Sequence, residues 1–238
     1  MQVAETATTE ISAPSAIRIW LGLTLALSAY AALLALGLWN DTRLTGSQLT
    51  NPVRLVSFWS PLMGLGVVGI VKFIEDAPLS SMGLRRPRFI DVDWGLVFFV
   101  FAMVTMARIG PVVDAHVRGI GFRMNEFSLL KGWTMIIFAA TMEELFFRGY
   151  LLERFERVTG STWIAALASL TLFAFGHLPG WGPAGVVRNL VWGAFVTGLY
   201  VWRRNLPICM MMHFLQNTSS LPSLWYTPLK RVFARGVF

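Results

Sequence analysis

Residues 17–39 read IRIWLGLTLALSAYAALLALGLW and contain a single charged side chain, Arg18. An α-helix needs about 20 apolar residues to cross a hydrocarbon core of about 30 Å. Backbone groups in lipid must pair within their own segment, and this run is too long for a barrel strand, so it predicts a membrane-spanning helix. The run is also too long for the apolar core of a signal peptide, so we expect it to stay in the mature protein.

Further apolar runs of similar kind follow along the chain. We predict about seven spans (seven or eight), with approximate bounds at residues 17–39, 56–74, 94–109, 132–152, 162–178, 185–202 and 206–221. The predicted fold is all-α, a polytopic transmembrane helical bundle that forms one membrane domain over residues 16–222. Residues 1–15 are polar and predict a disordered N-terminal tail. Residues 223–238 are basic and aromatic, and predict a tail that lies at the membrane interface.

The composition agrees with a membrane protein. Hydrophobic residues make up 55% of the chain and charged residues 14%, whereas a soluble domain has about 25% charged residues. The net charge is +7, but most Lys and Arg residues lie between or at the ends of apolar runs, as orientation signals and contacts with anionic headgroups do. We therefore predict a multi-pass integral membrane protein whose partner is the lipid bilayer and not nucleic acid. The single cysteine, Cys209, lies in an apolar run and is interpreted as a buried apolar side chain.

The most informative residues are charged and polar side chains inside these runs. An ionisable group at bilayer depth costs about 2.5–3.5 kcal/mol on insertion scales and by default marks a functional site. The first group is Glu143-Glu144-Leu145-Phe146-Phe147-Arg148-Gly149. Glu144 and Arg148 are four residues apart, so they share a helix face and can form an ion pair. Glu143 is rotated by about 100° from Glu144, so we predict that it faces elsewhere and finds a partner on another helix.

Two further groups each contain a histidine. Phe173-Ala174-Phe175-Gly176-His177 closes one run, and Phe173 and His177 share a face. In His213-Phe214-Leu215-Gln216-Asn217 the His213 and Asn217 side chains point the same way. Taken singly, His177 is more simply interpreted as an interfacial histidine bonded to backbone. Taken singly, His213 and Asn217 are more simply interpreted as hydrogen-bonding contacts between helices.

Taken together, these side chains favour a catalytic interpretation. A carboxylate beside an imidazole can take a proton from water, and a His and an Asn that donate hydrogen bonds can stabilise an oxyanion. Glu and His can also ligate zinc. The sequence therefore predicts a polar cavity on which Glu143, His177, His213 and Asn217 converge. The remaining histidine, His116, is expected in a polar loop at the solvated surface.

The three motifs resemble a known family. Glu-Glu-x-x-x-Arg at 143–148, Phe-x-x-x-His at 173–177 and His-x-x-x-Asn at 213–217 follow one another on successive predicted helices. This order is similar to that of the CPBP family, the CAAX protease and bacteriocin-processing (Abi) family, which includes the type II CAAX prenyl endopeptidases. The stretches EELFFRGYLL at 143–152 and GAFVTGLY at 193–200 add to the resemblance, which covers about residues 83–217.

The resemblance implies an intramembrane endopeptidase of the glutamate type. Glu143 and His177 would activate water, and His213 and Asn217 would form the oxyanion hole. Glu144, Arg148 and Phe173 would hold the site in shape. The resemblance favours a mechanism without a cofactor. A zinc mechanism, with Glu143, His177 and His213 as the metal ligands, stays open, although the chain lacks the His-Glu-x-x-His helix of the zincins.

Other functions stay open from the sequence. A non-catalytic member of the same family, such as a bacteriocin immunity or regulatory factor, would carry the same motifs. A proton-coupled transporter could also use intramembrane Glu and His, although we find no internal repeat of the kind that many transporters have. No feature identifies a prenyl-binding groove, so the expected substrate is a membrane-associated protein or peptide. The resemblance suggests the plasma membrane of a prokaryote as the location.

Overall fold

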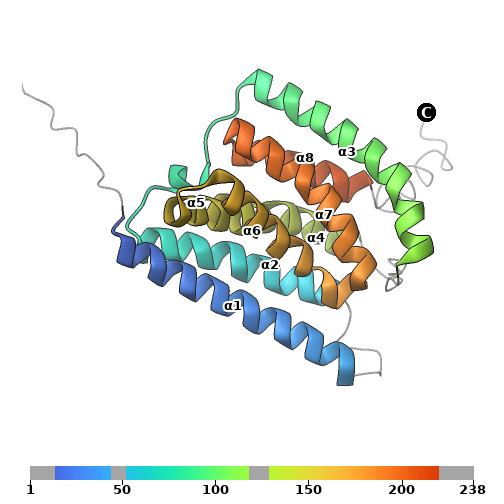
Figure 1. Ribbon diagram of the computed structural model, residues 1–238, viewed down its shortest axis with the longest axis horizontal. Helices are drawn as coiled ribbons and strands as arrows, with labels where there is room; N and C mark the ends of the chain where they lie inside the picture. Colours follow the sequence, from blue (N-terminus) through green and yellow to red (C-terminus); the bar gives the residue numbers. More distant parts are fainter. Residues whose placement is uncertain (1–13, 44–51, 118–128, 220–238) are drawn as a thin grey trace, which may run out of the picture.

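The computed structural model describes residues 14–43, 52–117 and 129–219. These ranges contain helices and no strand (Figure 1), which confirms the predicted all-α class. The predicted tail at 223–238, and all but residues 14 and 15 of the predicted tail at 1–15, lie outside the described residues. The extent of the membrane domain, residues 16–222, therefore stays a prediction.

Each predicted apolar run corresponds to one helix or to helices that follow without a break. The elements are α1 (Ala16–Arg43), α2 (Pro52–Gly69) with the π-helix η1 (Ile70–Ile74), the 3-10 helix η2 (Leu79–Met82), α3 (Phe89–His116), α4 (Leu129–Phe138) with the π-helices η3 (Ala139–Glu143) and η4 (Leu145–Leu152), α5 (Glu153–Thr159), α6 (Thr162–Phe175), α7 (Leu178–Arg203) and α8 (Leu206–Ser219). The third helix is longer than the predicted 94–109. It begins at Phe89 because the Asp91 carboxylate accepts a hydrogen bond from the Arg88 backbone N–H, at 2.9 Å.

Three of the described helices are long and apolar enough to cross a membrane. They are Ala16–Leu38 within α1, Phe89–His116 and Leu178–Arg203. Two shorter apolar helices, Ser60–Ile74 and Thr162–Phe175, lie among them. A helical membrane bundle is thus confirmed, whereas the number of spans, predicted as about seven, stays a prediction.

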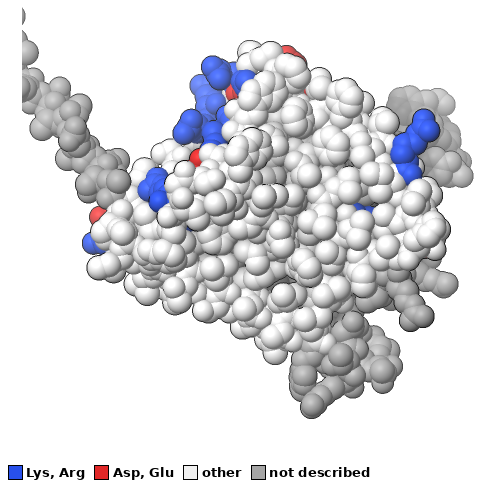
Figure 2. Space-filling model, viewed as in Figure 1, with Lys and Arg blue, Asp and Glu red and all other residues white. Residues whose placement is uncertain are grey.

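The π-helical segment lies in the interior of the bundle. In Figure 1, α3 runs along one edge beside α7 and α8, and α1 runs along the opposite edge beside α2. All eight residues of η4 are buried, including Arg148. Most of the face that Figure 2 shows is uncharged, and its charged side chains gather near the ends. Such a surface fits contact with lipid between two polar ends.

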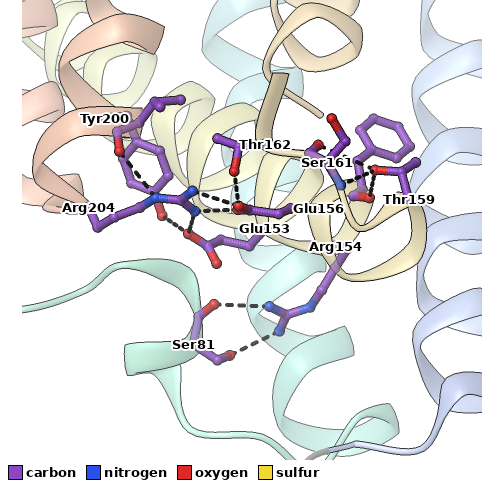
Figure 3. Close-up of polar contacts among 11 residues, drawn as sticks. Ser81, Glu153, Arg154, Glu156, Thr159, Ser161, Thr162, Tyr200 and Arg204 are labelled. Atoms are coloured by element: carbon purple, nitrogen blue, oxygen red, sulfur yellow. Dashed lines mark hydrogen bonds and ion pairs between the residues drawn. The ribbon is translucent and has the colours of Figure 1, made fainter. Parts of the chain in front are cut away.

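One end of the bundle is tied together by buried and half-buried ion pairs. Arg154 is fully buried, and its Nε donates to Glu75 Oε2 at 2.8 Å. Its other nitrogens donate to the carbonyl and the hydroxyl of Ser81, each at 3.0 Å (Figure 3). Tyr150 donates to the second oxygen of Glu75 at 2.9 Å. A buried guanidinium is tolerated here because its donors have partners with good geometry.

A second ion-pair cluster lies beside it, where α7 ends and α5 and α6 meet. Arg204 donates to Glu153 at 3.1 Å and to Glu156 Oε1 at 2.8 Å (Figure 3). The hydrogen bonds from Arg204 hold the pKa of the Glu156 carboxyl below its usual value. This cluster fixes the end of α7 against α5, which directly follows η4, and so helps to position the elements that carry the site.

Candidate active site

The two adjacent glutamates face different neighbours, as predicted. Glu144 Oε1 accepts hydrogen bonds from Arg148 Nη1 at 3.1 Å and from His213 Nδ1 at 2.8 Å. Glu143 Oε1 accepts a hydrogen bond from the Ser60 hydroxyl of α2 at 3.3 Å. Glu143 is the last residue of η3, and π-helical turns are frequent at functional sites.

Arg148 holds the predicted ion pair inside a larger network. Both Arg148 and Glu144 are fully buried. Arg148 also donates to the Thr197 hydroxyl at 3.4 Å and to the Gly193 carbonyl at 3.3 Å. Its guanidinium carbon lies 4.1 Å from the centre of the Phe173 ring, so the cation faces the π-system. This network joins the π-helical segment to α6 and α7.

His177 lies at the turn between α6 and α7, directly after Gly176. Its Nδ1 lies 2.8 Å from the Phe173 carbonyl oxygen. A carbonyl oxygen only accepts, so Nδ1 carries the proton and Nε2 of the neutral ring is left with a lone pair. The His177 ring also packs edge-on against the Phe173 ring, at 4.9 Å between centres. Both contacts fix the tautomer and the orientation of the imidazole.

Glu143 and His177 line the same cavity, which has a volume of about 120 Å³. That volume is enough for several water molecules, because a single water occupies about 10–15 Å³ in this measure. Ser60 and the hydroxyl-bearing Tyr30 also line it. The remaining lining residues are mostly apolar: Leu33, Leu34, Gly37, Met63, Phe147, Phe173, Gly176, Pro179, Gly180 and Trp181. The cavity thus offers a carboxylate and an imidazole to a reactant in otherwise apolar surroundings.

The segment after His177 bends beside the cavity. The helical path of α7 is broken at Gly182, where φ is 67° and ψ is −170°. Such a conformation is accessible to glycine and strained for other residues. Pro179, Gly180 and Trp181 precede this break, and all three line the cavity.

His213 and Asn217 are placed differently from Glu143 and His177. His213 is buried and bound to Glu144, and its ring lies 6.2 Å from the Phe173 ring. Asn217 is half-buried, one helical turn further along α8. Neither residue is among those that line the cavity. The structure therefore forms two pairs, Glu143 with His177 and Glu144 with His213, and the Phe173 ring lies against both histidines.

The zinc alternative does not fit this arrangement. Within the described ranges, no three His, Cys, Asp or Glu side chains come together as a group that could hold a metal ion. His213 would have to supply one ligand, but His213 does not line the cavity of Glu143 and His177. Neither of the other titratable residues singled out from the sequence lines the cavity. Cys209 is buried as predicted, and His116 is exposed but is the last residue of α3 instead of a loop residue.

Two residues of the site were not predicted from the sequence. Ser60 contacts Glu143, and Tyr30 lines the cavity while its hydroxyl donates to the Leu172 carbonyl at 2.5 Å. Both come from α1 and α2, which precede every motif. A single Ser or Tyr in an apolar run carries no periodic signal, although a polar group at this depth is expected to find a partner.

The comparisons with known proteins agree with the motifs. Residues 125–219 match the family model described as type II CAAX prenyl endopeptidase Rce1-like. This segment holds all three motifs, so the match confirms the resemblance and indicates a membrane protease. No curated protein and no solved structure matches the chain. Helices α1, α2 and α3 lie outside the matched residues.

Proposed function

We propose that this chain is an intramembrane endopeptidase that hydrolyses a peptide bond in a membrane-associated protein or peptide. In this proposal Glu143 and His177 activate the attacking water. The observation that carries it is the cavity inside the helical bundle, which is lined by both residues and has room for water. We further propose the plasma membrane of a prokaryote as its location, because the family resemblance suggests it.

The two groups suit the proton transfers of peptide hydrolysis. The Glu143 carboxylate and the unprotonated Nε2 of His177 can each accept a hydrogen bond from one water molecule. As the water oxygen attacks the carbonyl carbon, one of the two groups takes the water proton. The carbonyl oxygen becomes an oxyanion, and the proton passes to the departing amine when the C–N bond breaks. We assign the proton to the Glu143–His177 pair and not to one member of it.

We propose that His213 and Asn217 stabilise the oxyanion. The Nδ1 of His213 donates to Glu144, so Nε2 is the ring nitrogen left to face a substrate. Nε2 can donate to an oxyanion only when the ring carries a proton on both nitrogens. Asn217 lies one turn away on the same helix, where its amide can add a second donor. Because neither residue lines the cavity in this structure, the role requires bound substrate to extend the site toward α8.

The test uses purified full-length protein in lipid nanodiscs and a pooled peptide library. We expect wild type to cleave and Glu143→Gln to lose cleavage while remaining folded. Asp93→Asn, which removes an exposed carboxylate at the start of α3, is the control and should cleave normally. Equal cleavage by wild type and Glu143→Gln would contradict the proposal.

A chelator separates the two mechanisms. We propose catalysis without a metal, so cleavage should survive exhaustive chelation. Loss of cleavage on chelation and its return with zinc would instead assign Glu143, His177 and His213 to a metal. If the wild-type protein never cleaves a peptide, and cells that carry Glu143→Gln keep the wild-type phenotype, the result would favour a non-catalytic member of the family.

A further inference from the structure

We infer that Ser60 is a positioning residue that orients the Glu143 carboxylate in the cavity, and that close contact of α2 with η3 at Gly64 sets this bond. The catalytic consequence rests on the proposed function, whereas the orientation of Glu143 does not. Ser60 and Gly64 both precede the residues that match the family model. The inference therefore assigns part of the site to the N-terminal half of the chain.

The Ser60 hydroxyl is well placed for this role. Ser60 is 5% exposed and Glu143 is 8% exposed, so neither depends on bulk water for its hydrogen bonds. The Ser60 hydroxyl donates to Glu143 Oε1 at 3.3 Å. Glu144, by contrast, is held by both Arg148 and His213. A hydrogen bond to a buried carboxylate is worth more than one at the surface, because the alternative is an unsatisfied charge.

The position of Ser60 depends on how closely α2 approaches η3. Gly64 follows Ser60 by one helical turn, on the same face of α2. A Cβ added at Gly64 would lie 2.9 Å from the Cα of Met142, the residue before Glu143, and 2.7 Å from its Cβ. No side chain fits there, because Met142 already occupies the space that a Cβ would need. A side chain at Gly64 would push α2 away from η3 and lengthen the Ser60–Glu143 contact.

Two glycines on the same helix provide a matched pair. A Cβ at Gly66 would meet nothing within 4 Å, and Gly66 is exposed. Gly64→Ala and Gly66→Ala therefore make the same chemical change in the same helix, but only the first separates α2 from η3. At Ser60, Thr keeps the hydroxyl, whereas Ala removes it. Val has the shape of Thr without the hydroxyl, so Ser60→Thr and Ser60→Val form a second matched pair if Ser60→Ala does not fold.

The first measurement does not need activity. The infrared band of the Glu143 carboxyl group is identified as the band lost in Glu143→Gln, in full-length protein in nanodiscs. We expect this band to shift in Ser60→Ala, Ser60→Val and Gly64→Ala, and to stay in place in Ser60→Thr and Gly66→Ala. An unshifted band in folded Ser60→Ala or Ser60→Val would overturn the inference. If the band shifts in these variants but the wild-type protein never cleaves peptides, the result supports the inference and counts against the proposed function.

The second measurement links the bond to catalysis. Loss of the hydroxyl should lower kcat by about 10- to 100-fold, the effect of one hydrogen bond to a charged group. KM should change little, because the hydroxyl faces Glu143 and not the substrate. Ser60→Thr should recover most of kcat. A rise in KM with unchanged kcat would overturn the positioning role. The same holds if kcat in Ser60→Thr is as low as in Ser60→Val.

Discussion

The Nδ1 atom of His177 lies 2.8 Å from the carbonyl oxygen of Phe173, four residues earlier in the chain. The same bond forms at the end of α3, where His116 Nδ1 lies 2.9 Å from the Val112 carbonyl oxygen. The bond alone therefore does not define a catalytic histidine. The surroundings of the two rings differ, because His116 is exposed whereas His177 lines the cavity with Glu143.

This pair of histidines gives the first prediction. We expect His177→Gln to lower kcat by about 10²- to 10⁴-fold, the usual contribution of general acid–base catalysis. His116→Gln loses the same backbone contact but should keep wild-type kcat. Steady-state kinetics with a cleaved peptide would decide this, with thermal unfolding to verify that both variants fold. Comparable rate losses in both variants would mean that the backbone contact matters and the cavity does not.

The second prediction concerns Arg148. Arg148→Lys keeps the positive charge, but an ammonium cannot contact Glu144, Thr197 and Gly193 together as the guanidinium does. We expect a loss of roughly 3 kcal/mol in the free energy of unfolding, since breaking a buried pair costs about 3–5 kcal/mol. Arg157 is exposed on α5, so Arg157→Lys is the control and should leave stability unchanged. Denaturant titration in detergent micelles measures both, and equal stabilities would show that Arg148 acts by charge alone.

The third prediction compares two buried tyrosine hydroxyls. Tyr30 donates to the Leu172 carbonyl beside the cavity, and Tyr150 donates to Glu75 at the polar end of the bundle. Tyr30→Phe removes one of two hydrogen bonds to the Leu172 carbonyl, which still accepts from the Gly176 N–H, and Tyr150→Phe removes the donor to Glu75 Oε1. Each variant should therefore lose a hydrogen bond worth about 1–3 kcal/mol of stability, with the larger loss at the charged Glu75. Only Tyr30→Phe should also lower kcat, because Leu172 adjoins Phe173, which holds His177. A kcat that falls equally in both variants would trace the effect to stability.

The fourth prediction tests the packing of Gly83. Gly83 and Gly160 both have left-handed φ angles, 72° and 67°. A Cβ at Gly83 would lie 2.4 Å from the Tyr200 hydroxyl, whereas a Cβ at Gly160 would meet nothing within 4 Å. Gly160→Ala should therefore cost about 1–2 kcal/mol from backbone conformation, and Gly83→Ala should cost more. Thermal unfolding of the two variants measures the difference, and equal shifts would show that the loop before α3 yields to the added methyl group.

The sequence predicted the helices and the local pairs within them. An apolar run of membrane length must form a helix, because its backbone groups have to pair within the segment. The i, i+4 spacing of Glu144 and Arg148 predicted their ion pair. The rotation between adjacent helical residues likewise implied that Glu143 faces another helix. These inferences depend on the geometry of one helix, which a sequence specifies directly.

The convergence of the motifs was predicted only in part. The four residues Glu143, His177, His213 and Asn217 were expected around one cavity, but the structure separates the pair Glu143–His177 from the pair Glu144–His213. The motifs do not indicate how far apart their helices lie. That distance depends on the Phe173 ring between the two histidines and on the network around Arg148.

The sequence by itself determined that the chain is a helical membrane protein with charged groups inside its apolar runs, because hydropathy and helical periodicity are local properties. Only the tertiary structure decided which side chains share a cavity. Ser60 and Glu143 are 83 residues apart in the chain and meet because Gly64 lets α2 contact the backbone of η3. Helix packing of this kind depends on small residues and on shape complementarity across the whole interface, which no short motif contains.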